Sequence, residues 1–119
     1  MTAVECVSEA RAAGARLQQP INAFVDDFRR ADHALRARMI ADPVVAPGDI
    51  EGLVSAVVSA LCREQSVPTP AWVDEIGSPS PFFPFPARTF EMRLRLMLES
   101  PAPFRIRRVF VPENYLLRA

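Results

Sequence analysis

The chain has 119 residues, of which half are hydrophobic and 24% are charged, and this balance is typical of one globular domain with a single modest core. No stretch approaches the roughly 18 consecutive apolar residues of a membrane span. Acidic residues occupy the N-terminal segment, where a signal peptide carries a basic region. We therefore expect a cytoplasmic protein with no membrane partner.

Opposite charges cancel over the whole chain but are separated along it. Residues 1–85 contain seven arginines and eleven acidic residues, whereas residues 86–119 contain seven arginines and three acidic residues. Every basic residue is arginine, and the forked guanidinium group makes paired contacts with carboxylates and phosphates. The C-terminal third therefore favours a charged partner.

Two helices are predicted in the first third of the chain. Residues 3–18 are weakly periodic, and Gly14 weakens the predicted helix by about 1 kcal/mol relative to alanine. Pro20 suits a first helical position, and the helix it opens is predicted to run unbroken to residue 41, before Asp42-Pro43. Its apolar stripe consists of Ile21, Phe24, Phe28, Ala31, Leu35 and Met39.

A third helix, over residues 49–65, is predicted to be the most deeply buried element. Asp49 is a good N-cap, and the apolar set that follows is almost entirely aliphatic. Its members are Ile50, Leu53, Val54, Val57, Val58 and Leu61.

Residues 66–86 form a proline-rich loop that contains Trp72 and three phenylalanines. Thr69 is predicted to cap one short helical turn that includes Trp72, and the rest of the loop is irregular because proline disrupts helices and interior strands. Phe82, Phe83 and Phe85 either dock onto a partner or fold back onto the helices, and the sequence leaves both alternatives open.

The last third resumes a helix over residues 87–99 and continues into a C-terminal segment. Ser100-Pro101 is predicted to cap a short helix or turn, and residues 109–111 are predicted to be extended. The predicted helix 87–99 has an apolar side formed by Phe90, Leu94, Met97 and Leu98. We therefore predict one all-α domain, residues 1–119, of four to five helices, with the proline-rich loop crossing the bundle and the C-terminal segment packed on it.

The sequence shows no catalytic apparatus. It lacks a glycine-rich phosphate loop, a nucleophile elbow and metal-ligand spacing. His33 has no recognisable nucleophile beside it, and Cys6 and Cys62 are more typical of buried thiols than of a disulfide or metal pair. We predict a protein that is not an enzyme and that uses no metal or cofactor.

Two sets of charged residues, one acidic and one basic, are candidates for binding a partner. Asp26 and Asp27 are adjacent on a helix and point about 100° apart, so they suit contact with a partner better than paired acid–base chemistry. Arg105, Arg107 and Arg108 form a cluster that suits either acidic groups on a protein or the phosphates of a nucleic acid. A helix-turn-helix pattern is absent, yet a small nucleic-acid-binding transcriptional regulator remains the alternative to a protein-binding function.

Several sequence pieces together resemble a small domain that is common in actinobacteria. They are PTPAWVDE (68–75), SPFFPFP (80–86), LRLMLESPAPFRIRRVFV (94–111) and NYLLRA (114–119), with LQQPINAFVDDFRRA (17–31) and IADPVVAPGD (40–49) also fitting. That domain occurs alone or behind a helix-turn-helix repressor domain, and it is often encoded beside a nucleotidyltransferase toxin of the abortive-infection type.

The resemblance implies an antitoxin, which binds and blocks a cognate toxin. The DNA-binding domain is missing from this sequence, so partner binding is the expected role. Either the acidic first part of the chain covers a basic toxin surface, or the arginine-rich end enters an acidic metal–nucleotide site. As contact residues we predict, from the sequence itself, the arginine cluster, Phe82 to Phe85 and the acidic face around Asp26 and Asp27.

Overall fold

The computed structural model describes residues 1–85 and 87–117 of the chain. Within these residues the fold is helical, so the predicted all-α class is confirmed. The elements in chain order are α1 (Ala3–Ala13), the 3₁₀ turn η1 (Gly14–Arg16), α2 (Gln18–Arg30), α3 (His33–Met39), α4 (Asp49–Gln65), α5 (Ala71–Glu75), α6 (Phe90–Glu99) and α7 (Ala102–Arg105). Short helices such as α3, α5 and α7 make the observed number larger than the four to five expected. Pro86, which ends the predicted proline-rich loop, and residues 118–119 lie outside the described residues.

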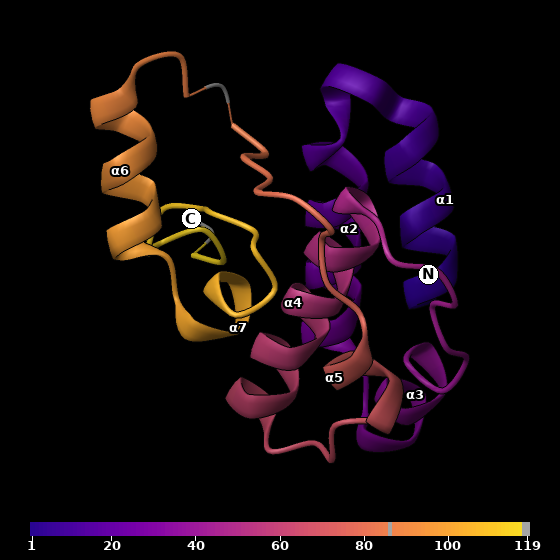
Figure 1. Cartoon of the computed structure of the whole chain (residues 1–119). Helices are drawn as coiled ribbons and strands as arrows, with labels where there is room; N and C mark the ends of the chain where they lie inside the picture. Colours follow the sequence, from indigo (N-terminus) through magenta and orange to yellow (C-terminus); the bar gives the residue numbers. More distant parts are fainter. Residues whose placement is uncertain (86, 118–119) are drawn as a thin grey trace.

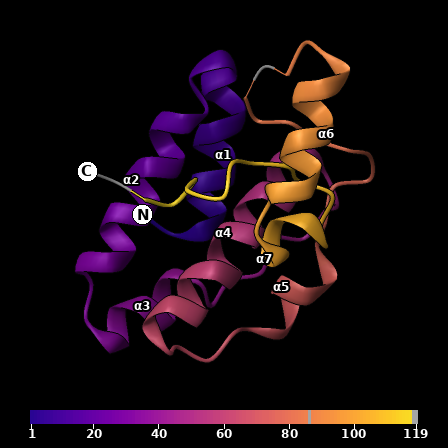
Figure 2. The same ribbon diagram turned by 90° about the vertical axis from the view of Figure 1, so that its left-hand side faces the viewer.

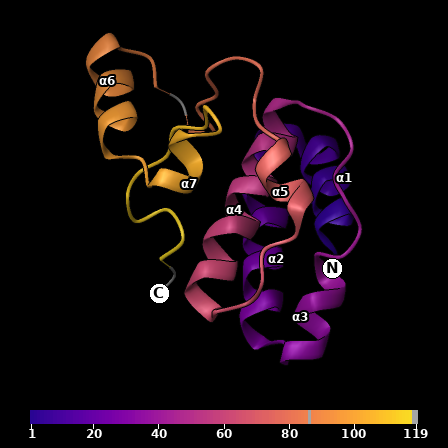
Figure 3. The same ribbon diagram turned by 60° about the horizontal axis from the view of Figure 1, so that its bottom comes forward.

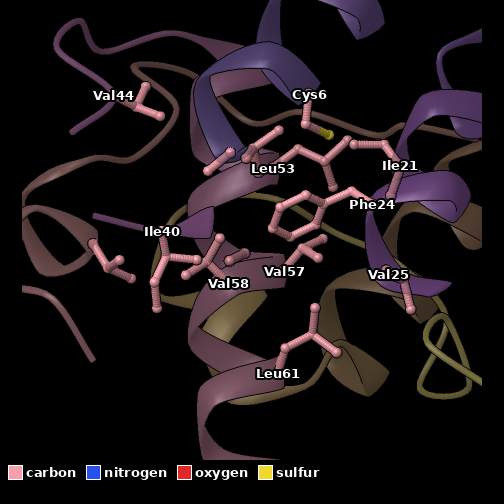
Figure 4. Packing of buried hydrophobic residues seen from close by; sticks show 14 of the residues in the cluster. Cys6, Ile21, Phe24, Val25, Ile40, Val44, Leu53, Val57, Val58 and Leu61 are labelled. Carbon is pink, nitrogen blue, oxygen red and sulfur yellow. The ribbon is translucent and has the colours of Figure 1, made fainter. Parts of the chain in front are cut away.

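Helix α4 is the centre of the fold. It contacts α1 and α2 on one side and α5 and α7 on the other, as Figures 1 and 2 show. All six aliphatic residues predicted for its apolar set are buried, and Figure 4 shows several of them packed against Phe24 and Ile21 of α2. Gly48 occupies the N-cap position expected for Asp49, whose carboxylate instead accepts a hydrogen bond from the Ile50 N–H at 2.7 Å.

The predicted helix over residues 20–41 is broken into α2 and α3, so the prediction of one continuous helix is wrong. Asp32 causes the break, because its carboxylate accepts a hydrogen bond from the Leu35 N–H at 2.8 Å and caps α3. The guanidinium of Arg36 donates to the carbonyl oxygens at the end of α2, those of Phe28 and Arg29, at 2.8 Å each. Leu35 therefore leaves the predicted stripe and becomes exposed.

Helix α1 is fixed at its start by a capping box. The Thr2 hydroxyl accepts from the Glu5 N–H, and the Glu5 carboxylate accepts from the Thr2 N–H. Gly14 ends the helix with φ of 58°, a left-handed value that favours glycine, and the chain turns through η1 into α2. The predicted helix over residues 3–18 thus consists of α1 followed by this turn.

The segment after α5 crosses α4 and meets the C-terminal segment. At Gly52 of α4 an added Cβ would lie 2.6 Å from the Ser78 nitrogen, so only glycine allows this close crossing. The Ser78 N–H donates to the Arg107 carbonyl, and residues 82 and 109 form a single parallel bridge. The Nε1 of Trp72 on α5 donates to the Ile40 carbonyl at 2.9 Å. The N-cap of α5 is Pro70, not Thr69 as predicted.

Helix α6 stands apart from the bundle. Figures 1 and 3 show it at the outer edge of the molecule, beyond α7. None of its residues is buried. The C-terminal segment below it is packed on the bundle, because α7 contacts α4 and Phe104 lies in the hydrophobic core.

Candidate interaction surfaces

The predicted arginine cluster is divided by the fold, because Arg107 lies inside the protein. Arg107 is 5% exposed. Its Nε and Nη2 donate to the Val73 carbonyl at 3.2 and 2.9 Å, and its Nη1 donates to the Pro103 carbonyl at 2.8 Å. Burial lowers the pKa of Arg107, and the nearby Asp74 carboxylate opposes this shift. Arg107 therefore connects α7 to α5 and does not present its guanidinium to a partner.

The rest of the cluster forms an exposed turn, which we call the arginine turn and define as Arg105, Ile106 and Arg108. Arg105 and Arg108 are exposed, and Ile106 between them is 73% exposed. Arg108 has φ of 60°, a left-handed value uncommon for a residue with a side chain. Its carbonyl accepts from the Phe82 N–H at 2.9 Å, and its Nη1 donates to the Pro79 carbonyl at 3.0 Å. The turn is thus attached to the proline-rich loop by hydrogen bonds at residues 79 and 82.

The three phenylalanines of the loop fold back onto the C-terminal segment. The ring centroid of Phe83 lies 5.3 Å from that of Phe110, and the Arg93 guanidinium lies 5.9 Å above the Phe83 ring. The Phe85 ring meets Tyr115 edge to face at 5.6 Å, and Phe82 packs against the core. Of the two alternatives left open by the sequence, this arrangement favours the one in which these side chains support the fold.

Asp26 and Asp27 lie on α2. Figures 1 and 2 place α2 on one side of α4 and place α7, which ends at Arg105 of the arginine turn, on the other side. Asp27 pairs with Arg30 at 2.9 Å and with the Met1 amino group at 3.5 Å. Both aspartates are half-buried. The fold therefore does not combine the predicted acidic and basic residues into one surface.

One exposed apolar surface of the described residues was not among the sequence-predicted sites. It is formed by Phe90, Leu94, Met97 and Leu98 of α6, a set that we call the α6 stripe. Phe90 is 78% exposed and Leu98 is 71% exposed. The helical spacing of these residues is visible in the sequence, but periodicity alone does not say whether a stripe faces a core or solvent.

The structure also places the histidine and the two cysteines that the sequence raised as candidates for chemistry. No group of three or more His, Cys, Asp and Glu side chains in this part of the chain is arranged to hold a metal ion. His33 is exposed beside a shallow hollow lined by Pro68 and Pro70. Cys6 and Cys62 are buried free thiols, and burial raises the pKa of Cys6 to about 12, which keeps its thiol protonated and unreactive.

None of the helices in the described residues is long and apolar enough to cross a membrane. Comparisons of the chain with protein-family models, with curated proteins and with solved structures found no match.

Proposed function

We propose that this chain is a non-enzymatic, antitoxin-like protein that binds and neutralises a cognate toxin in the cytoplasm. The partner implied by the sequence resemblance is a nucleotidyltransferase encoded by a neighbouring gene. The observation that carries the proposal is the arginine turn: two exposed arginines flank an exposed isoleucine on a segment that buried hydrogen bonds hold in place.

This arrangement suits a protein interface for two reasons. Arginine and large apolar side chains provide much of the binding energy where partners meet, and a surface that is already ordered loses little entropy on binding. Arg107 and the bridge between residues 82 and 109 supply that order. The natural target is an acidic concave surface, such as the metal–nucleotide site of a nucleotidyltransferase, where each guanidinium contacts a carboxylate.

The proposal is tested by co-expression with the neighbouring gene products, each also induced alone. We expect one neighbour to stop growth alone, to co-purify with this chain and to be harmless beside it. The variants Arg105→Glu and Ile106→Glu should weaken that complex at least about tenfold, which corresponds to about 1.4 kcal/mol. Matched controls are Arg38→Glu and Val45→Glu, which change an exposed arginine and an exposed apolar residue away from the turn.

The proposal fails if no neighbour is toxic or bound, or if the control variants weaken the complex as much as the turn variants do. Duplex DNA is the competing partner of the same turn, because five of the arginines after residue 86, Arg88, Arg93, Arg95, Arg105 and Arg108, are exposed. Binding to any duplex that falls steeply with salt, and that Arg105→Glu reduces, would support the nucleic-acid-binding regulator instead.

A further inference from the structure

The α6 stripe is an apolar surface that no other element of the described chain covers. Positions 90, 94, 97 and 98 fall within about 100° of one another around the helix, and all four side chains are exposed. On the other side of α6 Leu96 is half-buried, and just after the helix the Ser100 hydroxyl donates to the Val111 carbonyl of the C-terminal segment at 2.9 Å. A stripe of this width on a ten-residue helix is typical of a helix that packs against another helix.

Two opposite charges lie along one edge of this stripe. Glu91 and Arg95 are one turn apart on the same side of Leu94 and Leu98, and together they line a shallow groove. Glu91 is exposed, and Arg95, with an 83% exposed side chain, lies 3.6 Å from the Glu99 carboxylate. Both groups therefore remain accessible to a partner.

We propose that a second copy of this chain covers the α6 stripe, with the two α6 helices packed antiparallel about a two-fold axis near Leu94. In that arrangement Leu94 meets Leu94 of the partner subunit, and Phe90 meets Leu98 of the partner subunit. The charged edges also face each other, so Glu91 lies opposite Arg95 of the partner subunit, and the reverse pair forms by symmetry. The two-fold axis thus packs the apolar stripe against itself and forms two Glu91–Arg95 cross-pairs.

The parallel arrangement fits less well. It would bring the edge that carries Glu91 and Arg95 against the other edge of the stripe, which carries Arg93. That arginine is already engaged with the Ala87 carbonyl and the Phe83 ring. A ten-residue helix is about 15 Å long, so the contact lies at the small end of specific interfaces and the dimer should dissociate on dilution.

The first experiment measures the mass of the purified chain by sedimentation equilibrium over a wide concentration range. We expect a shift from one 13.2 kDa chain to two as concentration rises. Leu94→Glu should abolish the shift, whereas Val45→Glu, at an exposed valine outside α6, should leave it unchanged. Because Leu94 is exposed, thermal melts at low concentration should show that the variant still folds.

The second experiment tests the antiparallel register. Glu91→Arg places like charges in both cross-pairs of the dimer, and so does Arg95→Glu, so each variant alone should dimerise at least about tenfold more weakly. An equal mixture of the two variants should recover the dimer, because each cross-pair then joins opposite charges. The double variant carrying both changes should also recover it.

Several results would overturn the proposal. These are a chain that stays monomeric at all concentrations, a dimer that survives Leu94→Glu, and a mixture of charge variants that dimerises no better than its components. A monomer whose toxin protection is lost with Leu94→Glu would assign α6 to the toxin. The mass measurements use this chain alone, so they succeed or fail independently of the proposed toxin.

Discussion

Replacing Phe104 with alanine should test whether the C-terminal segment is part of the core. Phe104 on α7 is 1% exposed, packs within the core and meets the Tyr115 ring edge to face at 5.4 Å. Truncation of a buried phenylalanine costs about 3 to 5 kcal/mol, because it removes apolar burial and leaves a cavity. The free energy of unfolding should fall by that amount in urea denaturation, and the melting temperature should fall by on the order of 10 °C.

Phe90→Ala is the matched control, since it makes the same chemical change at a side chain that is 78% exposed. It should change the free energy of unfolding by less than about 0.5 kcal/mol when measured at low protein concentration, where the proposed dimer is dissociated. Equal effects of the two substitutions, or a Phe104→Ala protein as stable as the parent, would show that the C-terminal segment is not anchored in the core.

Three further predictions concern single groups. Arg107→Met should lower the free energy of unfolding by about 2 to 4 kcal/mol in urea denaturation, because the buried carbonyls of Val73 and Pro103 lose their donors, and Arg107→Lys should recover part of the loss. The hydrogen bond from Arg29 lowers the pKa of Glu64, so their 2.8 Å pair should stabilise the fold by about 1 kcal/mol or less above the ordinary glutamate value of 4.5. This contribution should be lost as pH falls below 4.5 and through the lowered folded-state pKa, so the stability difference between the parent and Glu64→Gln should shrink in that direction. Cys6, with its pKa raised to about 12, should resist iodoacetamide at pH 8 in the native protein and react once urea unfolds it, as mass spectrometry would detect.

The core was predictable from the sequence because burial there follows helical periodicity. The spacing of Ile21, Phe24 and Phe28 gives α2 one buried face. In α4 the six predicted aliphatic residues are buried, and residues 52–58 are buried on every side of the helix. The end of α2 was missed because Asp32 has two roles that sequence alone does not separate. It fits an i,i+4 ion pair with Arg36 inside a helix and equally an N-cap, and in the structure Asp32 caps α3 while Arg36 donates to the carbonyls at the end of α2.

The surfaces were less predictable than the core, because which arginine is buried depends on contacts distant in sequence. Arg105, Arg107 and Arg108 look alike in a local pattern, yet only Arg107 lies where the Val73 carbonyl, 34 residues earlier, needs a donor. Likewise, whether the α6 stripe is buried or exposed depends on whether a distant element covers it, and the stripe's own sequence does not reveal this. The signal for exposure was indirect: the segment between α5 and α6 leads away from the bundle, as Figure 1 shows, and Pro79, Pro81 and Pro84 in it disfavour a helix that would continue the bundle.

The arginine turn and the α6 stripe both belong to the segment after α5, and this placement determines how variants should be used to study them. The segment is attached to the bundle by buried contacts, chiefly those of Phe104 and Arg107 and the 2.7 Å hydrogen bond from Tyr115 to Gln18. Loss of one of these contacts would disturb both surfaces, so a joint loss of toxin binding and dimerisation in Arg107→Met would say nothing about either one. Ile106→Glu and Leu94→Glu change exposed side chains on different elements and leave the attachment intact. Only such surface variants can show that toxin binding and self-association use separate faces of the same segment.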